Sequence, residues 1–160
     1  MTIAGFNINI GVFLRVKAVA SINRSALVMH SAAQMYGLVN DVQSYPEFLD
    51  GCAKVELIES SEVHMVARLH LSKAGLSYQF VTRNALTHNS TIELELEQGP
   101  FDYLRGSWLF TPLRADACKV EMALDFGVTG LKGKALGGLF SPIAANMVDA
   151  FCKRADIIYK

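Results

Sequence analysis

Apolar and polar residues alternate along much of the chain between residues 17 and 126. In the segment 92–97, for example, Ile92, Leu94 and Leu96 alternate with three glutamates. A period of two places successive side chains on opposite faces of an extended chain, so each such segment predicts a β-strand with one apolar face. The segments that we predict as strands are 17–29, 53–57, 63–71, 76–80, 92–97, 104–110 and 118–126.

The first predicted strand, residues 17–29, has Val19, Ile22 and Val28 as candidates for its buried side. Short segments rich in Gly, Pro, Asn, Asp and Ser separate the later strands and predict turns. Consecutive short strands joined by tight turns favour an antiparallel meander, here of six to seven strands.

Residues 31–52 break the alternation and predict two short helices. Ser31 and Gln34 have the spacing of a capping box, in which each side chain accepts a hydrogen bond from the other residue's backbone N–H. Pro46 disfavours helical dihedrals at Tyr45 and suits the first turn of the second helix. The apolar stripe of the first helix comprises Met35, Leu38, Val39 and Val42. The apolar anchors of the pair are Tyr45, Phe48 and Leu49.

The end of the chain has a helical period. Five glycines between residues 127 and 138 separate it from the last strand. A proline such as Pro142 is tolerated at a helix start and costs about 3 kcal/mol inside one. We therefore expect a regular helix from about Ser141 to Tyr159, and a looser helical segment over residues 131–140. One side of this helix comprises Ile143, Met147, Ala150, Phe151, Arg154 and Ile158.

These elements predict one architecture. One-sided strands need a cover for their apolar face, and the C-terminal helix has a matching apolar side. The expected fold class is α+β, with a curved antiparallel sheet wrapped on the C-terminal helix and the two short helices closing one end. The space between sheet and helix is either a filled core or a tunnel for an apolar ligand, and periodicity leaves both alternatives open.

Composition narrows the class of protein. The 160 residues suit a single domain, 51% of them are hydrophobic, and the formal net charge is zero. A neutral balance supplies no long-range attraction to nucleic acid or to an anionic membrane. Three cysteines without close spacing, Cys52, Cys118 and Cys152, predict buried thiols in a reducing cytoplasm.

Residues 1–16 form an apolar extension in front of this domain. The run is too short, and too interrupted by Asn7 and Asn9, to predict a transmembrane helix. Positive charge follows the apolar part rather than preceding it, which disfavours a secretory signal. We expect an extra strand or disorder here.

No pattern of residues predicts a catalytic or metal site. His64 and His70 fall on the polar face of their strand, and residues 93, 95 and 97 are glutamates on one solvated face. Nucleophile motifs, phosphate-binding loops and zinc-ligand spacings are absent from the sequence. These observations favour a protein that is not an enzyme and requires no cofactor or metal.

Several short motifs resemble the coenzyme Q-binding, START-like family of helix-grip (polyketide cyclase-like) proteins. The first group is Leu38-Val39-Asn40-Asp41-Val42, Tyr45-Pro46-Glu47-Phe48-Leu49 and Gly51-Cys52. The second group is Gly99-Pro100-Phe101, Trp108-Leu109-Phe110, Phe151, Arg154-Ala155 and Tyr159. Together they span roughly residues 20–160, and their order and spacing are specific to the family.

The resemblance implies a single START-like domain over residues 17–160 and a hydrophobic ligand, ubiquinone or a related isoprenoid lipid, in support of respiratory quinone function. The bacterial branch of the family includes the ribosome association toxin RatA. Binding to the large ribosomal subunit, which would block subunit joining, is therefore the alternative function. An aromatase or cyclase-type enzyme is a third alternative. A DNA partner is not expected, and transient membrane contact stays open.

Candidate site residues follow from the apolar stripes and from the resemblance. The expected cavity residues are Tyr45, Phe48, Leu94, Trp108, Phe110, Phe140, Ile143, Met147 and Phe151. The expected polar contacts at the cavity mouth are Arg83 and Arg154. The expected ribosome contacts are Lys132, Lys134 and Lys153.

Overall fold

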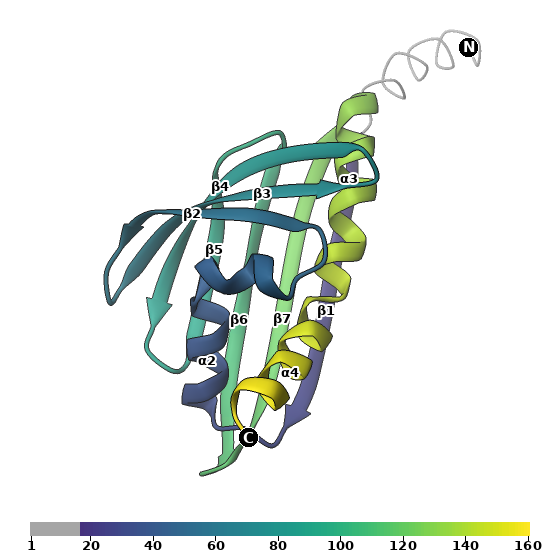
Figure 1. The fold of residues 1–160 in the computed structure, drawn as a ribbon. Coiled ribbons are helices and arrows are strands. Elements are labelled where there is room, and N and C mark those ends of the chain that lie inside the picture. The colour runs from purple at the N-terminus through teal and green to yellow at the C-terminus, as the bar shows by residue number, and fades with distance from the viewer. Residues whose placement is uncertain (1–16) are drawn as a thin grey trace, which may run out of the picture.

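Seven antiparallel strands form one curved sheet in the computed structural model, which describes residues 17–160 (Figure 1). The strands are β1 (Lys17–Val28), β2 (Cys52–Ser60), β3 (His64–Lys73), β4 (Leu76–Thr87), β5 (Thr91–Gln98), β6 (Tyr103–Arg114) and β7 (Ala117–Thr129). Their spatial order is β1-β7-β6-β5-β4-β3-β2. Strands β2 to β7 are thus the predicted meander, and β1 extends it by pairing with β7. The expectation for residues 1–16 lies outside the described residues.

Within this described part of the chain, four helical segments cover one face of the sheet. They are α2 (Ala32–Asn40), the 3₁₀-helix η1 (Val42–Glu47), α3 (Gly130–Ala145) and α4 (Met147–Ile158). Helices α3 and α4 run along β1 and β7, and α2 packs against α4, β6 and β7 (Figure 1). The predicted α+β helix-grip arrangement is confirmed.

The capping box at the start of α2 is present. The Ser31 hydroxyl accepts a hydrogen bond from the Gln34 backbone N–H at 3.1 Å, and the Gln34 side chain accepts one from the Ser31 N–H at 3.0 Å. The second helix differs from the prediction, because η1 begins at Val42 and contains Pro46 near its end rather than in its first turn. A 3₁₀-helix tightens the bend, and the Tyr45 hydroxyl fixes it by donating to the Val39 carbonyl.

The C-terminal helix also corrects the sequence analysis. Residues 131–140 belong to the regular helix α3, which begins at Gly130 and contains Pro142 in its last turn. The break falls instead at Asn146, where the helix axis bends by about 40° into α4. The burial of α3 against the sheet outweighs the free-energy cost of Pro142 inside the helix, because buried residues of α3 lie both before and after this proline. That face includes Leu136, Leu139, Phe140, Ile143 and Ala144.

Two strands depart from the expected division of faces. Val19 is 67% exposed, whereas Ile22 is buried and Val28 is half-buried. Residues 19 and 22 are an odd number of positions apart, so a period of two places them on opposite faces. In β2, Ala53 and Leu57 are exposed; Ala53 lies within the register shift between Cys52 and Lys54, and Leu57 directly precedes the shift before Glu59.

Aromatic rings fasten both helices to the sheet. Phe151 of α4 is fully buried, and its ring centroid lies 5.3 Å from Tyr45, 5.2 Å from Phe48 and 5.3 Å from Trp108. Phe140 of α3 makes a similar cluster. Its neighbours at 5.0–5.9 Å are Phe80, Phe101 and Phe126. These edge-to-face pairs connect the sheet, the η1 segment and both helices.

Replacing Phe151 with alanine should therefore destabilise the whole domain. Truncation of a buried phenylalanine costs about 3–5 kcal/mol of unfolding free energy. Urea unfolding of Phe151→Ala measures this loss. The matched control is Ile157→Ala on the same helix, where the side chain is 62% exposed and the expected change is within about 0.5 kcal/mol. A loss below about 1 kcal/mol for Phe151→Ala would contradict the role given to this ring.

Candidate functional site

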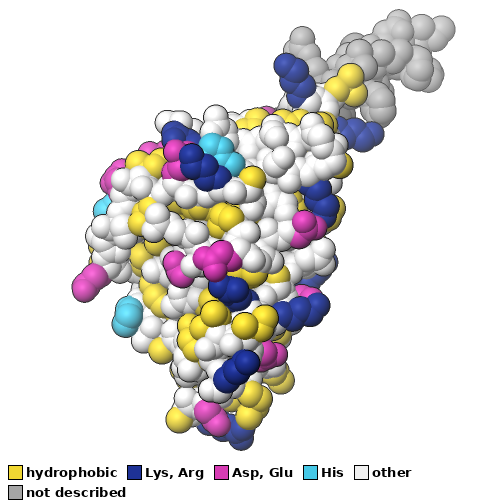
Figure 2. All heavy atoms as spheres, viewed as in Figure 1, with side chains coloured by type: hydrophobic (Ala, Val, Ile, Leu, Met, Phe, Trp, Pro, Cys, Tyr) yellow, Lys and Arg dark blue, Asp and Glu magenta, His cyan; other side chains and the backbone are white. Residues whose placement is uncertain are grey.

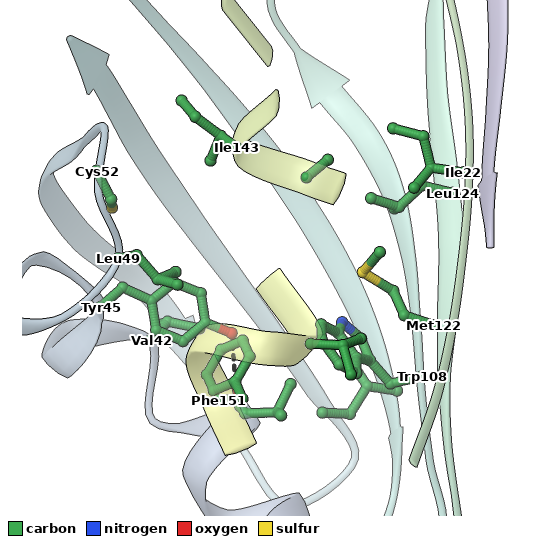
Figure 3. Packing of buried hydrophobic residues seen from close by; sticks show 14 of the residues in the cluster. Ile22, Val42, Tyr45, Leu49, Cys52, Trp108, Met122, Leu124, Ile143 and Phe151 are labelled. Carbon is green, nitrogen blue, oxygen red and sulfur yellow. Dashed lines mark hydrogen bonds between the residues drawn. The ribbon is translucent and has the colours of Figure 1, made fainter. Parts of the chain in front are cut away.

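A cavity of about 80 Å³ lies between the inner face of the sheet, the η1 segment and helices α3 and α4. Figure 3 shows its surroundings, with Tyr45 and Leu49 on one side, Trp108 and Leu124 on the sheet, and Ile143 on α3. Six of the predicted cavity residues line it. They are Tyr45, Leu94, Trp108, Phe140, Ile143 and Met147.

Three predicted cavity residues lie outside the lining. Phe151 and Phe110 are fully buried core residues, and Phe110 lies parallel to Trp108 with ring centroids 6.3 Å apart. Phe48 is half-buried and lines a separate, outer hollow near the break between α3 and α4. Periodicity could not separate these from the lining residues, because core and cavity wall occupy the same face of an element.

Two polar residues of β4 line the otherwise apolar cavity. Thr82 and Asn84 are buried, and the Asn84 Oδ1 atom has no hydrogen-bond partner among residues 17–160. A buried amide oxygen without a partner costs about 1–3 kcal/mol of folding free energy. The sequence patterns did not predict this pair. The available signal was parity, since residues 82 and 84 fall between buried Phe80 and Leu86 at spacings of two.

The two ionisable groups in the lining are both uncharged at neutral pH. Burial raises the pKa of the Cys52 thiol to about 11, against a smaller opposing effect of the Lys54 backbone N–H. Burial also raises the pKa of the Tyr45 hydroxyl far above its ordinary value, with smaller contributions from Cys52 and Asp41. The wall of the cavity therefore carries no charge, which suits a neutral ligand.

An outer hollow of about 430 Å³ adjoins the cavity at the break between α3 and α4. Leu49 and Ile143 line both spaces, so these two side chains separate them. Gly51 has φ of +91°, and a Cβ atom there would lie 2.5 Å from Ile143 Cδ1. The glycine thus allows the η1 loop to close tightly on α3.

Charged side chains rim this hollow in pairs. Lys73 Nζ lies 2.6 Å from Asp50 Oδ2, and Arg154 donates to Glu47 at 2.8 Å. The hydrogen bond from Lys73 lowers the pKa of the Asp50 carboxyl. The Arg154 guanidinium also lies 5.1 Å from the centre of the Phe48 ring. Arg154 therefore lies at the rim of the outer hollow, and its predicted role as a polar contact at the cavity mouth stays a prediction.

Arg83, the other predicted mouth residue, lies elsewhere. Its parity places it on the outer face of the sheet, where it pairs with Glu97 at 3.3 Å and Glu59 at 3.5 Å. The outer face also carries the pair His70–Glu56, at 2.6 Å. Among residues 17–160, no group of His, Cys, Asp and Glu side chains is placed to hold a metal ion.

The predicted ribosome contacts do not converge. Lys132 and Lys134 are exposed on the first turns of α3, and Lys153 is exposed on α4, where it pairs with Asp149 at 3.0 Å. At about 1.5 Å of rise per residue, Lys132 and Lys153 are roughly 30 Å apart along the bent helix pair. The three lysines therefore lie at two separate places along the helices, Lys132 and Lys134 at one and Lys153 at the other.

Comparison with known proteins identifies the family. Residues 28–152 match the family described as polyketide cyclase / dehydrase and lipid transport. The chain belongs to this family. The fold agrees, because the Zhui aromatase/cyclase from Streptomyces sp. R1128 superimposes with a TM-score of 0.77 at 19% identity, over 89% of this chain and 97% of that one. A START superfamily protein from Mycobacterium smegmatis gives 0.71 at 20% identity, over 86% and 98%.

Bacterial members of the family are much more similar in sequence. The persistence and stress-resistance toxin PasT from Escherichia coli O6:H1 is 50% identical over 94% of this chain and 96% of its own. The ribosome association toxin RatA from Escherichia coli K12 is 49% identical over the same shares. The mitochondrial coenzyme Q-binding protein COQ10 homolog B from Xenopus laevis is 25% identical, over 86% of this chain and 58% of that protein. The resemblance to the coenzyme Q-binding, START-like family and its RatA branch is thus confirmed.

Proposed function

We propose that the chain is a non-enzymatic binding protein for an apolar ligand, ubiquinone or a related isoprenoid lipid, and that it works in the cytoplasm in support of respiratory quinone function. The observation that carries this proposal is the uncharged apolar cavity with its two buried polar residues. Similarity to the COQ10 homolog supports the ligand class. The lining, as far as residues 17–160 form it, contains no pair of groups suited to acid–base catalysis, which favours binding over turnover.

Uptake of such a ligand requires the cavity to enlarge. Its volume of about 80 Å³ is below the roughly 300–1,000 Å³ of typical ligand sites. Displacement of Leu49 and Ile143 would join it to the outer hollow of about 430 Å³, giving room for a tail. Removal of a tail from water contributes about 25 cal/mol per Å², which offsets the cost of this movement.

Membrane contact during delivery is compatible with the helices. Among residues 17–160, no single helix is both long enough and apolar enough to span a membrane. The bent pair of α3 and α4, taken together, has the length and the apolar composition of a span. The buried face of α3 serves the core of the domain. Because this face stays packed in the core, we propose that the ligand is exchanged at the membrane surface rather than by insertion of these helices into the membrane.

Filling the cavity should abolish uptake. Met147 is half-buried and lines the cavity, and Met147→Trp replaces its side chain with a bulkier indole ring. The amount of bound quinone should therefore fall roughly tenfold or more, while the fold is retained. Solvent extraction followed by absorbance of the released quinone measures the amount bound. The matched control, Ile158→Trp, adds the same ring at an exposed position of α4 and should bind like the wild type. Unchanged quinone retention by Met147→Trp would contradict a binding space here.

A second candidate function is association with the large ribosomal subunit, with a block of subunit joining. The observation that favours it is the 49–50% identity to RatA and PasT over nearly the full length. The surface offers little independent support, because charges of both signs are interspersed over the face that Figure 2 shows. The exposed Lys132 and Lys134 are the strongest candidates for phosphate contacts.

Removing those two charges tests this candidate. In a Lys132→Ala/Lys134→Ala variant, co-sedimentation with purified large subunits should weaken, and the slope of log affinity against log salt should fall by about 2. Lys54→Ala, an exposed lysine on β2, is the matched control and should leave the slope unchanged. Equal slopes for all three proteins would exclude this part of α3 as the ribosome contact.

A further inference from the structure

Asn84 stands out because the oxygen of its buried side chain has no hydrogen-bond partner among residues 17–160, and Thr82 is the other buried polar residue of β4 in the cavity wall. Both lie on the inner face of β4, with Asn84 8% exposed and Thr82 6% exposed. Within the described part of the chain, the Asn84 Oδ1 atom has no hydrogen-bond partner although it is buried. The side chains of both residues line the cavity beside Leu94 and Trp108.

The strands on either side place apolar residues next to this pair. Thr82 lies opposite Ala67 of β3 and Leu96 of β5. Asn84 lies opposite Met65 of β3 and Leu94 of β5. Because directly opposed side chains share a face, both polar groups are surrounded by apolar ones across the sheet. A purely structural cavity wall would favour apolar residues at both positions.

We infer that Asn84, assisted by Thr82, is the group that recognises an oxygen atom of the ligand. This inference rests on the proposed ligand-binding function and names its specificity-determining residue. A carboxamide donates to a carbonyl oxygen through its N–H and accepts from a hydroxyl through Oδ1. The site therefore suits an uncharged ring that carries carbonyl or hydroxyl groups, in its oxidised or its reduced form, and disfavours a plain hydrocarbon.

The orientation of the bound molecule follows from the same geometry. Residues 82 and 84 lie inside the cavity, whereas Leu49 and Ile143 separate the cavity from the outer hollow. An oxygen-bearing ring would thus lie innermost, with its apolar tail directed past Leu49 and Ile143. Trp108 lines the same cavity and is the single tryptophan of the chain, so its fluorescence reports on the ring.

The test compares two probes and three proteins. The probes are a benzoquinone with one isoprene unit and its matched hydrocarbon, an isoprenyl benzene without ring oxygens. Quenching of Trp108 measures quinone binding, and competition against that quenching measures hydrocarbon binding. Wild type should prefer the quinone by roughly tenfold, and Asn84→Leu should bind both probes equally. The control Asn40→Leu should keep the wild-type preference, because it also removes an amide with a buried, unpaired oxygen, but outside the cavity lining.

Thermal unfolding of the ligand-free proteins gives a second, independent readout. Asn84→Leu removes a buried group that lacks a partner for its oxygen, so its melting temperature should rise by about 2–4 °C. A lower melting temperature would show that Asn84 stabilises the fold, which overturns the inference.

The outcomes separate this inference from the proposed function. A quinone preference that persists in Asn84→Leu, or a wild type that binds both probes equally, overturns the role of Asn84 and leaves the ligand-binding function standing. A wild type that binds neither probe overturns the ligand-binding function, and the inference with it.

Discussion

The attachment of the C-terminal helices to the sheet by buried aromatic rings is the interaction on which the rest of this structure depends. Phe151 joins α4 to the η1 segment and to Trp108 of β6, and Phe140 joins α3 to Phe80 of β4 and Phe126 of β7. The cavity lies between these two attachments. Edge-to-face pairing is a preferred geometry of aromatic rings, so these contacts favour one position of each helix beside the cavity. The bend at Asn146 lets one helix pair follow the curved sheet past both clusters.

Two features between the sheet and the helices cost folding free energy in the ligand-free protein. An apolar cavity reduces packing, and the unpaired oxygen of Asn84 adds the cost of a buried polar group. Neither feature stabilises the ligand-free fold. Both become favourable once a molecule with an apolar body and a polar oxygen fills the space, and this is why the cavity carries the proposed function. The alternative, ribosome association, rests on similarity to RatA rather than on a feature of the surface.

Local rules predicted most of the fold. The capping box of Ser31 and the alternating strands depend on neighbours in sequence, so the sequence alone was sufficient. Pro142 was misjudged because tertiary packing of α3 outweighs its local preference. The site was predicted in part. Its apolar residues follow from the periodic stripes, but the division between core and lining depends on contacts across elements. Asn84 was overlooked because a polar residue in a strand is expected to face solvent.

The central claim is that the space between sheet and helices holds an uncharged, oxygen-bearing apolar molecule. Mass spectrometry of small molecules released from the full-length protein, purified from its own cells under native conditions, tests this claim most directly. Our account predicts stoichiometric release of a quinone or a related isoprenoid lipid. Protein that retains its native fold and releases no such molecule, even when purified from isolated membranes, would contradict it.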